Sequence, residues 1–288
     1  MSRTPPPADP APGVIDADPW ADLRRYTAAR LALGRAGASL PTAEVLRFGL
    51  AHAKARDAVH IPLDAAALRA GLEADGLPTL AAHSAAPDRV TYLARPDLGR
   101  TLAADSAAAL RAQADPAGCD LLLVIADGLS SLAVARNARA LVAEIRRGLH
   151  AGWTLGPVVV ATQARVALAD EIGQALGARL VAMLIGERPG LSSPDSLGLY
   201  LTWAPQPGRS DAQRNCISNI RPEGLGYAEA ARRLWWLCEE ARRLGLTGVA
   251  LKDNSDAALP AADAPPALPT ATRTDAASTP DSDAQDKQ

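Results

Sequence analysis

Four long apolar runs separated by segments of helical periodicity constrain this fold more than any other feature of the sequence. The runs are CDLLLVIADG from Cys119, PVVVATQ from Pro157, RLVAMLIGE from Arg179 and LGLYLTWAP from Leu197, with a shorter one, TGVALKD, from Thr247. The helical patterns cover residues 130–148, 166–176 and 227–244. Continuous apolar strands that alternate with helices are typical of a parallel sheet buried on both faces. We therefore predict an α/β fold, with a Rossmann-like, mostly parallel sheet flanked by helices in the C-terminal half.

The region before this sheet is predicted to be mainly helical. Helical patterns cover residues 20–34, 40–60 and 64–71, and Thr42 is the expected N-cap of the second helix. The ends of the chain are rich in Pro, Ala and Asp and have no periodic apolar residues, so we expect them to be disordered. The predicted divisions are a disordered tail at 1–18, a mainly helical region at 19–115, a Rossmann-like domain at 116–253 and a disordered tail at 254–288.

Charge and composition argue against nucleic acid or a membrane as the partner. The net charge is −2 and aromatic residues make up 3% of the chain, so neither phosphate attraction nor base stacking is favoured. No apolar run approaches the ~18 residues of a membrane span, and the N-terminus lacks the apolar stretch of a secretory signal. The three cysteines are widely spaced, which is typical of reduced thiols in a cytoplasmic protein and not of a zinc site.

Three loops follow the predicted strands, where open α/β sheets bind their ligands. They are ADGLSS (126–131), ATQARVA (161–167) and GERPGLSSPDS (186–196), and they form one crevice if their strands are adjacent. Glu187 would then lie at the mouth of a ligand site, although a charge at a strand end is also commonly just solvated. Simpler roles are favoured for the other charges: a helix N-cap for Asp127, and surface salt bridges for Arg165 and Arg188.

The sequence contains no recognisable catalytic set. It has no phosphate loop of the G-x-x-x-x-G-K-[ST] type, and no Ser-His-Asp or Cys-His arrangement can be assembled from the spacing. The histidines are expected to be surface or packing residues and not metal ligands; they are His52, His60, His83 and His150. Cys216 could be a nucleophile, but a buried loop thiol is the favoured interpretation. These observations favour a cofactor-binding or interface subunit over a complete enzyme, with no catalytic and no metal-binding residue in this chain.

Five motifs, in order along the chain, resemble the small (light) subunit of ethanolamine ammonia-lyase. They are YLARPDLGR, VIADGLS, QARVALADEIG, LIGERPGLSSPDSLG and RNCISNIRP, and the resemblance covers about residues 20–253. It implies a subunit of an adenosylcobalamin-dependent lyase that converts ethanolamine to acetaldehyde and ammonia. It also implies a Rossmann-like domain, a large TIM-barrel subunit that holds the substrate, and a corrinoid between the two chains. The cobalamin contacts of the family correspond to Val166, Glu187 and Cys216.

The resemblance further implies a hetero-oligomer of paired large and small subunits in the cytoplasm, and it leaves open a location inside a bacterial microcompartment. His150 does not lie in the Asp-x-His-x-x-Gly motif of proteins that replace the cofactor's own base, so we expect adenosylcobalamin to be bound base-on. The alternatives are a non-enzymatic Rossmann-like corrinoid-binding adaptor or sensor, and a self-contained small-molecule enzyme. The latter would need the phosphate loop or catalytic set that the sequence lacks.

Overall fold

The computed structural model describes residues 14–258. Its described residues up to Asp253 belong to one compact unit, and those from Asn254 belong to a second, which contains the 3₁₀ turn η4 (Ser255–Ala258). The predicted disordered tails at 1–18 and 254–288 lie largely outside the described residues. Among the described residues, no helix combines the length and the apolar character needed to cross a membrane.

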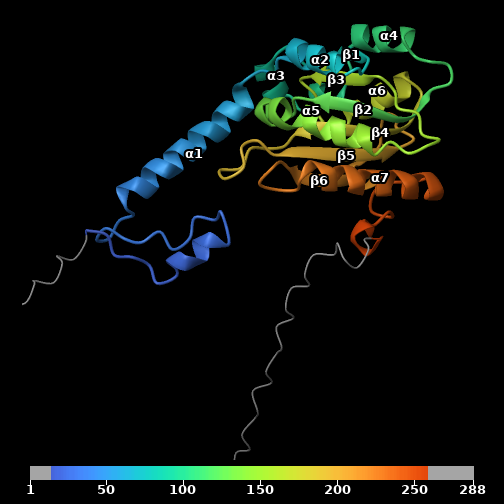
Figure 1. Cartoon of the computed structure of the whole chain (residues 1–288). Coiled ribbons are helices and arrows are strands. Elements are labelled where there is room, and N and C mark those ends of the chain that lie inside the picture. The colour runs from blue at the N-terminus through green and yellow to red at the C-terminus, as the bar shows by residue number, and fades with distance from the viewer. Residues whose placement is uncertain (1–13, 259–288) are drawn as a thin grey trace, which may run out of the picture. The chain divides into compact units, whose positions relative to one another are not determined.

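One six-stranded sheet organises the chain, with the strand order β1-β3-β2-β4-β5-β6 (Figure 1). Strands β1, β3, β2 and β4 pair in parallel, whereas β5 is antiparallel to both β4 and β6. The strands are β1 (Thr79–His83), β2 (Cys119–Ala126), β3 (Val158–Thr162), β4 (Ala178–Gly186), β5 (Leu197–Trp203) and β6 (Arg214–Ile220).

The sheet is mixed, so the predicted Rossmann-like, mostly parallel sheet is correct only in part. The β4–β5 connection is the loop 187–196, which contains no helix. A parallel crossover normally needs a dozen or more residues, and a shorter connection returns the chain antiparallel. The predicted strand from Thr247 does not form, because Gly248 adopts φ 93° and breaks the extended run. Strands β1 and β6 were not predicted.

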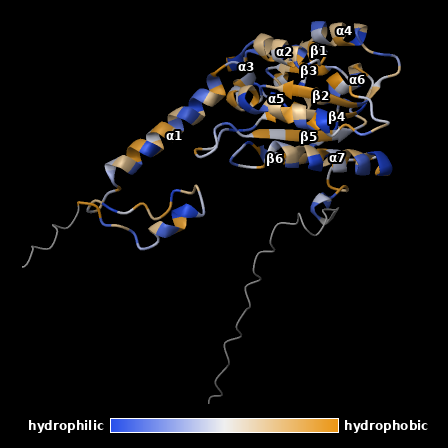
Figure 2. Cartoon of the chain, in the orientation of Figure 1, coloured by the Kyte–Doolittle hydropathy of each residue, from blue (hydrophilic) through white to orange (hydrophobic). Residues whose placement is uncertain are grey.

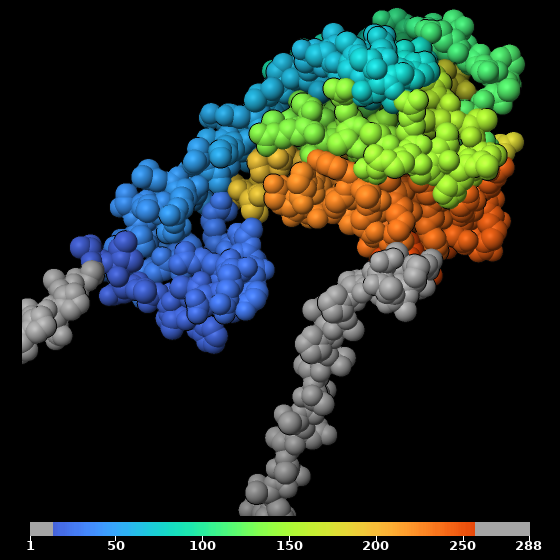
Figure 3. Space-filling view, in the orientation of Figure 1, coloured from blue at the N-terminus to red at the C-terminus, as the bar shows by residue number. Residues whose placement is uncertain are grey.

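Helices cover both faces of the sheet and create two cores. On one face α2 (Ala65–Ala74), α5 (Ser131–Arg147) and α7 (Tyr227–Leu244) pack on side chains such as Leu123 and Leu184. Figure 3 shows this side, with α2 in cyan, α5 in light green and α7 in orange over the strands. On the other face α4 (Ala104–Ala112) and α6 (Leu168–Ala175) pack on alternate side chains such as Val124 and Met183. The central strands are accordingly mostly apolar (Figure 2).

The N-terminal region only partly follows its helical pattern. Helix α1 (Thr42–His60) forms as predicted, but Pro41 is its N-cap and Thr42 makes no capping bond. The predicted helix at 20–34 is wrong: only the 3₁₀ turn η1 (Ala21–Arg25) forms there. Left-handed backbone at Ala32 (φ 52°) and Gly34 (φ 76°) is incompatible with a continuing helix. The short elements α3 (Arg89–Ala94), η2 (Leu98–Arg100) and η3 (Asp211–Gln213) complete the fold.

Large apolar side chains are exposed along the segment 14–61. Trp20 and Tyr26 are exposed, and so are four apolar residues in the first half of α1. Those four are Val45, Leu46, Phe48 and Leu50. They point in different directions around the helix axis, and Figure 2 shows apolar positions along the helix without one polar face. Charged residues such as Arg47 and Arg56 lie on the same helix, so α1 has neither a purely apolar nor a purely polar face.

Candidate functional site

The three predicted loops meet in one crevice, as expected. Strand β2 lies between β3 and β4, and all three are parallel, so their following loops share one edge of the sheet. The crevice has a volume of about 420 Å³. It is lined by Tyr92, Gly128, Leu129, Arg165, Val166, Ile185, Gly186, Glu187, Arg188 and Tyr200.

The loop that carries Val166 is held in place by two buried side chains. The Asp127 carboxylate accepts the backbone N–H groups of Gln163 (2.9 Å) and Ala164 (3.0 Å), and the Tyr92 hydroxyl donates to the Ala164 carbonyl (3.0 Å). Gln163 has a left-handed φ of 54°, which is costly for a non-glycine residue unless its surroundings fix it. The three bonds therefore orient the backbone immediately before Arg165 and Val166.

Asp127 is not the helix N-cap that the sequence suggested. Ser130 caps α5 by accepting the N–H of Ala133, at 3.1 Å. Asp127 is only 2% exposed, and its carboxylate also accepts the N–H of Gly128 at 2.9 Å and Arg89 Nη1 at 3.1 Å. Burial raises the pKa of Asp127, and the N–H groups and Arg89 oppose that shift. The residue thus ties the end of β2 to α3 and to the β3–α6 loop, contacts that no local pattern could reveal.

Glu187 follows the last residue of β4 and its carboxylate is held by neutral donors. The Ser196 hydroxyl donates to it, and the N–H of Asn219 lies 3.3 Å from Oε2. Asn219 has φ 58° and lies at an irregularity in the β5–β6 pairing, where the ladder skips between Leu197 and Leu199. Such bulges redirect backbone groups and often occur beside functional sites. A Cβ at Gly198 would be 3.0 Å from Glu187 Oε1, so glycine leaves room for the carboxylate.

Cys216 is exposed in the edge strand β6, so the prediction of a buried loop thiol is wrong. It is paired with Tyr200 of β5, whose other partner is Met183 of β4. Cys216 lies on the face of the sheet that α4 and α6 cover. These two helices pack on the inner strands, and the outer strands β5 and β6 extend beyond them. Although the residue is exposed at the surface, neighbouring protein atoms partly desolvate its thiol and raise the pKa of Cys216; a hydrogen bond from Tyr200 opposes the shift, and nearby Glu187 adds to it. A thiol with a raised pKa is a poor nucleophile at neutral pH.

Tyr200 brings the three predicted residues into one site, although sequence reasoning missed it. It lines the crevice with Val166 and Glu187, and it lies beside Cys216 on the sheet. Burial, with Cys216 and Glu187 as neighbours, raises the pKa of Tyr200, so the phenol stays neutral. The signal that could have found it is the polar-tipped tyrosine within the apolar run LGLYLTW.

Arg165 and Arg188 do not form the predicted surface salt bridges with any described residue. Both line the crevice. The Arg165 guanidinium lies 4.5 Å from the centre of the Tyr92 ring, and Arg89 lies 4.8 Å from it. Burial raises the pKa of Tyr92, so this ring too remains neutral. Tyr92 therefore supports Arg165 by a cation–π contact and orients the following residue, Val166.

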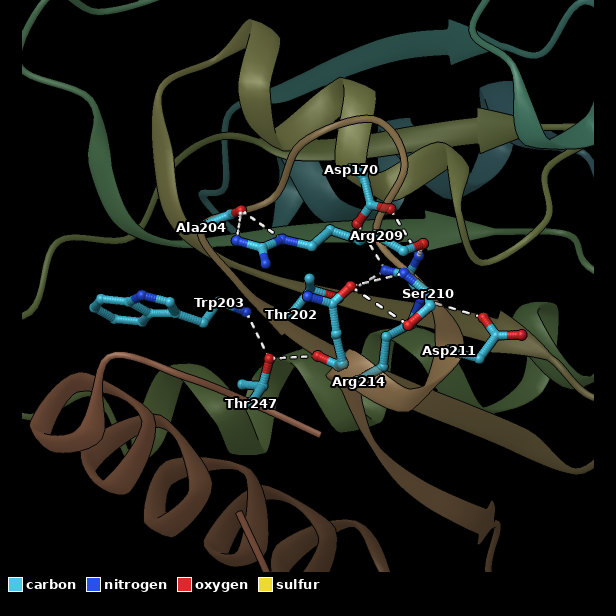
Figure 4. Close-up of polar contacts among 10 residues, drawn as sticks. Asp170, Thr202, Trp203, Ala204, Arg209, Ser210, Asp211, Arg214 and Thr247 are labelled. Atoms are coloured by element: carbon cyan, nitrogen blue, oxygen red, sulfur yellow. Dashed lines mark hydrogen bonds and ion pairs between the residues drawn. The ribbon is translucent and has the colours of Figure 1, made fainter. Parts of the chain in front are cut away.

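A buried ion pair anchors β6 beneath the site (Figure 4). Arg214, the first residue of β6, donates from Nη1 and Nη2 to the two oxygens of Asp170 on α6, both at 2.7 Å. The Arg214 and Asp170 side chains are 1% and 2% exposed. Arg214 also donates to Thr202 of β5 and to the carbonyl of Arg209. This cluster couples α6, which follows Val166, to the strand that carries Cys216.

Selective labelling of Cys216 is expected in the native chain. Cys119 and Cys238 are less accessible, and burial raises the pKa of Cys119 to about 11. N-ethylmaleimide should therefore modify one thiol in the folded protein and three after denaturation, as counted by mass spectrometry. Because the pKa of Cys216 is also raised, the labelling rate should keep rising above the usual thiol pKa. The variant Cys216→Ser should show no fast labelling; a fast reaction in that variant would contradict this exposure pattern.

The crevice is suited to binding and not to covalent catalysis. Among the crevice residues no nucleophile is paired with a histidine or other base. It offers instead three apolar side chains, two neutral phenols, one carboxylate with free acceptor capacity and two arginines. The close backbone at Gly128 and Gly186, where a Cβ would lie 2.3 Å and 2.1 Å from backbone oxygens, leaves no room for side chains at the base of the crevice. The fold and the site thus define an α/β protein with a strand-end binding crevice, whose described lining contains no nucleophile paired with a base.

Comparison with known proteins gives the family. The sequence model of the ethanolamine ammonia-lyase light chain matches residues 17–252. The chain is 58% identical over 254 residues to the ethanolamine ammonia-lyase small subunit of Ralstonia nicotianae, covering 87% of this chain and 94% of that one. It is 57% identical over 242 residues to the small subunit of Pseudomonas syringae pv. tomato, covering 83% and 84%. The chain belongs to the family of ethanolamine ammonia-lyase small subunits.

Proposed function

We propose that this chain is the cobalamin-binding, non-catalytic subunit of an ethanolamine ammonia-lyase, which forms acetaldehyde and ammonia from ethanolamine. The observation that carries the proposal is the assembly of Val166, Glu187 and Cys216 around Tyr200 at one edge of the sheet. These are the positions at which the family resemblance implies contacts with cobalamin. The substrate and the reacting groups would belong to the large subunit.

The residues of the crevice fit a corrinoid. A corrin is a wide, largely apolar ring fringed with amides. Val166 and the Tyr200 ring supply an apolar surface for it, and the Glu187 carboxylate can accept amide N–H groups. A hydrogen bond to a charged group contributes about 1.5–3 kcal/mol. Adenosylcobalamin supplies radical chemistry when bound, and the protein's share is to position it and exclude water.

The positions of the histidines support base-on binding. No histidine lines the crevice. His150 stacks on Trp235 and lies 3.2 Å from Glu239, and His83 lies beside Asp105, so both have partners elsewhere. A histidine of this chain that replaced the cofactor's own base would have to approach the cobalt from this crevice. The proposed cofactor is therefore adenosylcobalamin with its dimethylbenzimidazole still on cobalt.

The exposed apolar surface of the segment 14–61 supports a protein partner. Trp20, Tyr26 and Phe48 are exposed aromatic side chains of the kind that is enriched in protein interfaces. The partner proposed here is the large subunit, in a hetero-oligomer of paired large and small subunits. Co-expression of this chain with a large subunit from the same family, followed by an assay of adenosylcobalamin-dependent ammonia release, tests the proposal. Ammonia release should need both chains. If the chain binds cobalamin but adds nothing to a large subunit, it is an adaptor or sensor instead.

The variant Glu187→Gln is expected to weaken cobalamin retention and to spare turnover. Losing the charge at one hydrogen bond should weaken the affinity of the assembled enzyme about ten-fold. Turnover at saturating cofactor should remain near that of the wild type, because Glu187 is assigned to binding and not to proton transfer. The matched control is Glu223→Gln, an exposed carboxylate in the turn after β6. Lost turnover with unchanged affinity would instead make Glu187 catalytic.

A further inference from the structure

The strand-end crevice contains more positive charge than its own acids neutralise. Arg165 and Arg188 line it, and Arg100 lines a smaller adjoining hollow that shares Arg165, Val166 and Tyr200. Among the described residues, none of the three arginines has a carboxylate partner. Of the acids nearby, Asp127 pairs with Arg89, Asp211 lies 3.3 Å from Arg214 Nε, and Glu187, whose donors are neutral, offsets one of the three positive charges. The site as the protein alone forms it therefore keeps a net positive charge.

Arg165 is held rigidly for a residue without an ionic partner. Its N–H donates to the Gly99 carbonyl at 2.8 Å, and its guanidinium lies on the Tyr92 ring. A Cβ at Gly99 would be 3.0 Å from Arg165 Cγ, so the side chain is packed along its stem. A long side chain loses rotamer entropy when it is fixed in this way, and the cation–π contact with Tyr92 is the interaction of the guanidinium that compensates for this loss.

The two arginines beside the Tyr92 ring, and Gln163 in the β3–α6 loop, have buried polar atoms without partners. Arg165 Nε and Arg89 Nη2 are both buried and have no hydrogen-bond partner, and Gln163 Oε1 is in the same state. The Arg89 side chain is only 10% exposed. Unsatisfied buried groups are rare in native proteins and commonly indicate an absent ion, ligand or water. Two of these three atoms are guanidinium nitrogens, which are donors, and they lie on the arginines that flank Tyr92.

We infer that Arg165 binds the phosphodiester of the cofactor's nucleotide loop. The inference rests on the proposed function and adds an anion subsite to it. The peripheral side chains of cobalamin are neutral amides, and the phosphodiester is the ionised group among them. A guanidinium matches a phosphate with two parallel N–H donors, which a lysine or an amide cannot reproduce. Arg165 lines both hollows, so a group bound there lies beside Val166 and Tyr200.

The test compares two corrinoids that differ in this group. Complexes of the large subunit with wild-type chain or with Arg165→Met are titrated with cyanocobalamin and with dicyanocobinamide, which lacks the phosphodiester and nucleotide. Corrinoid absorbance after equilibrium dialysis gives each Kd. The substitution should weaken cyanocobalamin binding about ten- to hundred-fold and leave dicyanocobinamide within about twofold. The methionine side chain keeps an apolar stem against Tyr92. If the Arg165→Met variant does not assemble with the large subunit, the variant Arg165→Gln is used in its place.

The control removes an arginine outside the site. Arg111 lies on α4 and lines a separate hollow, so Arg111→Met should change neither Kd. Added salt should weaken cyanocobalamin binding more in the wild type than in Arg165→Met, because an ion pair is screened. Equal weakening of both corrinoids, or of neither, overturns the phosphodiester contact and leaves the proposed function standing. A wild-type complex that binds no corrinoid overturns both.

Discussion

The variant Asp170→Asn is expected to lower the free energy of unfolding by about 3–5 kcal/mol. Asp170 and Arg214 are almost completely buried and are joined by two bonds of 2.7 Å. The amide leaves the Arg214 guanidinium in the interior with the largely exposed Asp211 as its remaining acid, 3.3 Å from Nε. The cost comes mostly from this uncompensated charge and not from the lost attraction. Urea denaturation of the purified chain, alone or in its complex, measures the change in the free energy of unfolding.

A double variant separates the buried charge from the loss of packing. Asp170→Leu combined with Arg214→Met removes both charges, and it should recover at least half of the loss seen in Asp170→Asn. The exposed pair between Asp75 and Arg139 provides the comparison, since Asp75→Asn should cost less than about 1 kcal/mol. If the double variant is no more stable than the single one, the buried charge is not the cause. Cys216 labelling in the same variants reports whether β6 loosens.

The variant Asp127→Asn is expected to destabilise the fold by a similar amount, about 3–5 kcal/mol, and to release the loop before Val166. The carboxylate accepts three backbone N–H groups and Arg89 Nη1. The amide of the asparagine has only one acceptor oxygen, so its NH₂ group would face a backbone N–H donor. Arg89 would also lose its counter-ion. Denaturation gives the change in stability, and hydrogen exchange of the Gln163 and Ala164 amides reports the loop directly.

The local readout distinguishes this effect from general destabilisation. In Asp127→Asn the amides of Gln163 and Ala164 should lose protection before those of the β2 core, whereas Asp170→Asn should leave their relative order unchanged. Cobalamin affinity should fall with loop protection, because Arg165 and Val166 follow directly. Intact protection of both amides, together with a loss of less than about 1 kcal/mol, would show that Asp127 does not hold the loop.

The sequence by itself determined the elements whose signal is local. Strands β2, β3, β4 and β5 are apolar along their length, and α5, α6 and α7 have a helical apolar period, so each could be located without its neighbours. The positions of the strand-end loops could be predicted from these strands. Because β3, β2 and β4 are neighbours in the sheet, the three loops form one crevice. Val166 and Glu187 were therefore placed correctly at its edge.

Tertiary structure alone decided the rest, because the contacts concerned link residues far apart in the chain. The direction of β5 depends on the short β4–β5 loop, and β6 lies on the edge with too few apolar residues to predict a strand. Asp127 has the local pattern of a helix cap, but its carboxylate instead accepts the backbone N–H groups of Gln163 and Ala164, 36 and 37 residues later in the chain. Because β6 pairs with β5 outside the strands that α4 and α6 cover, Tyr200 lies beside Cys216 and the Cys216 side chain is exposed. Pairing across the sheet, and not local propensity, assembles this binding site.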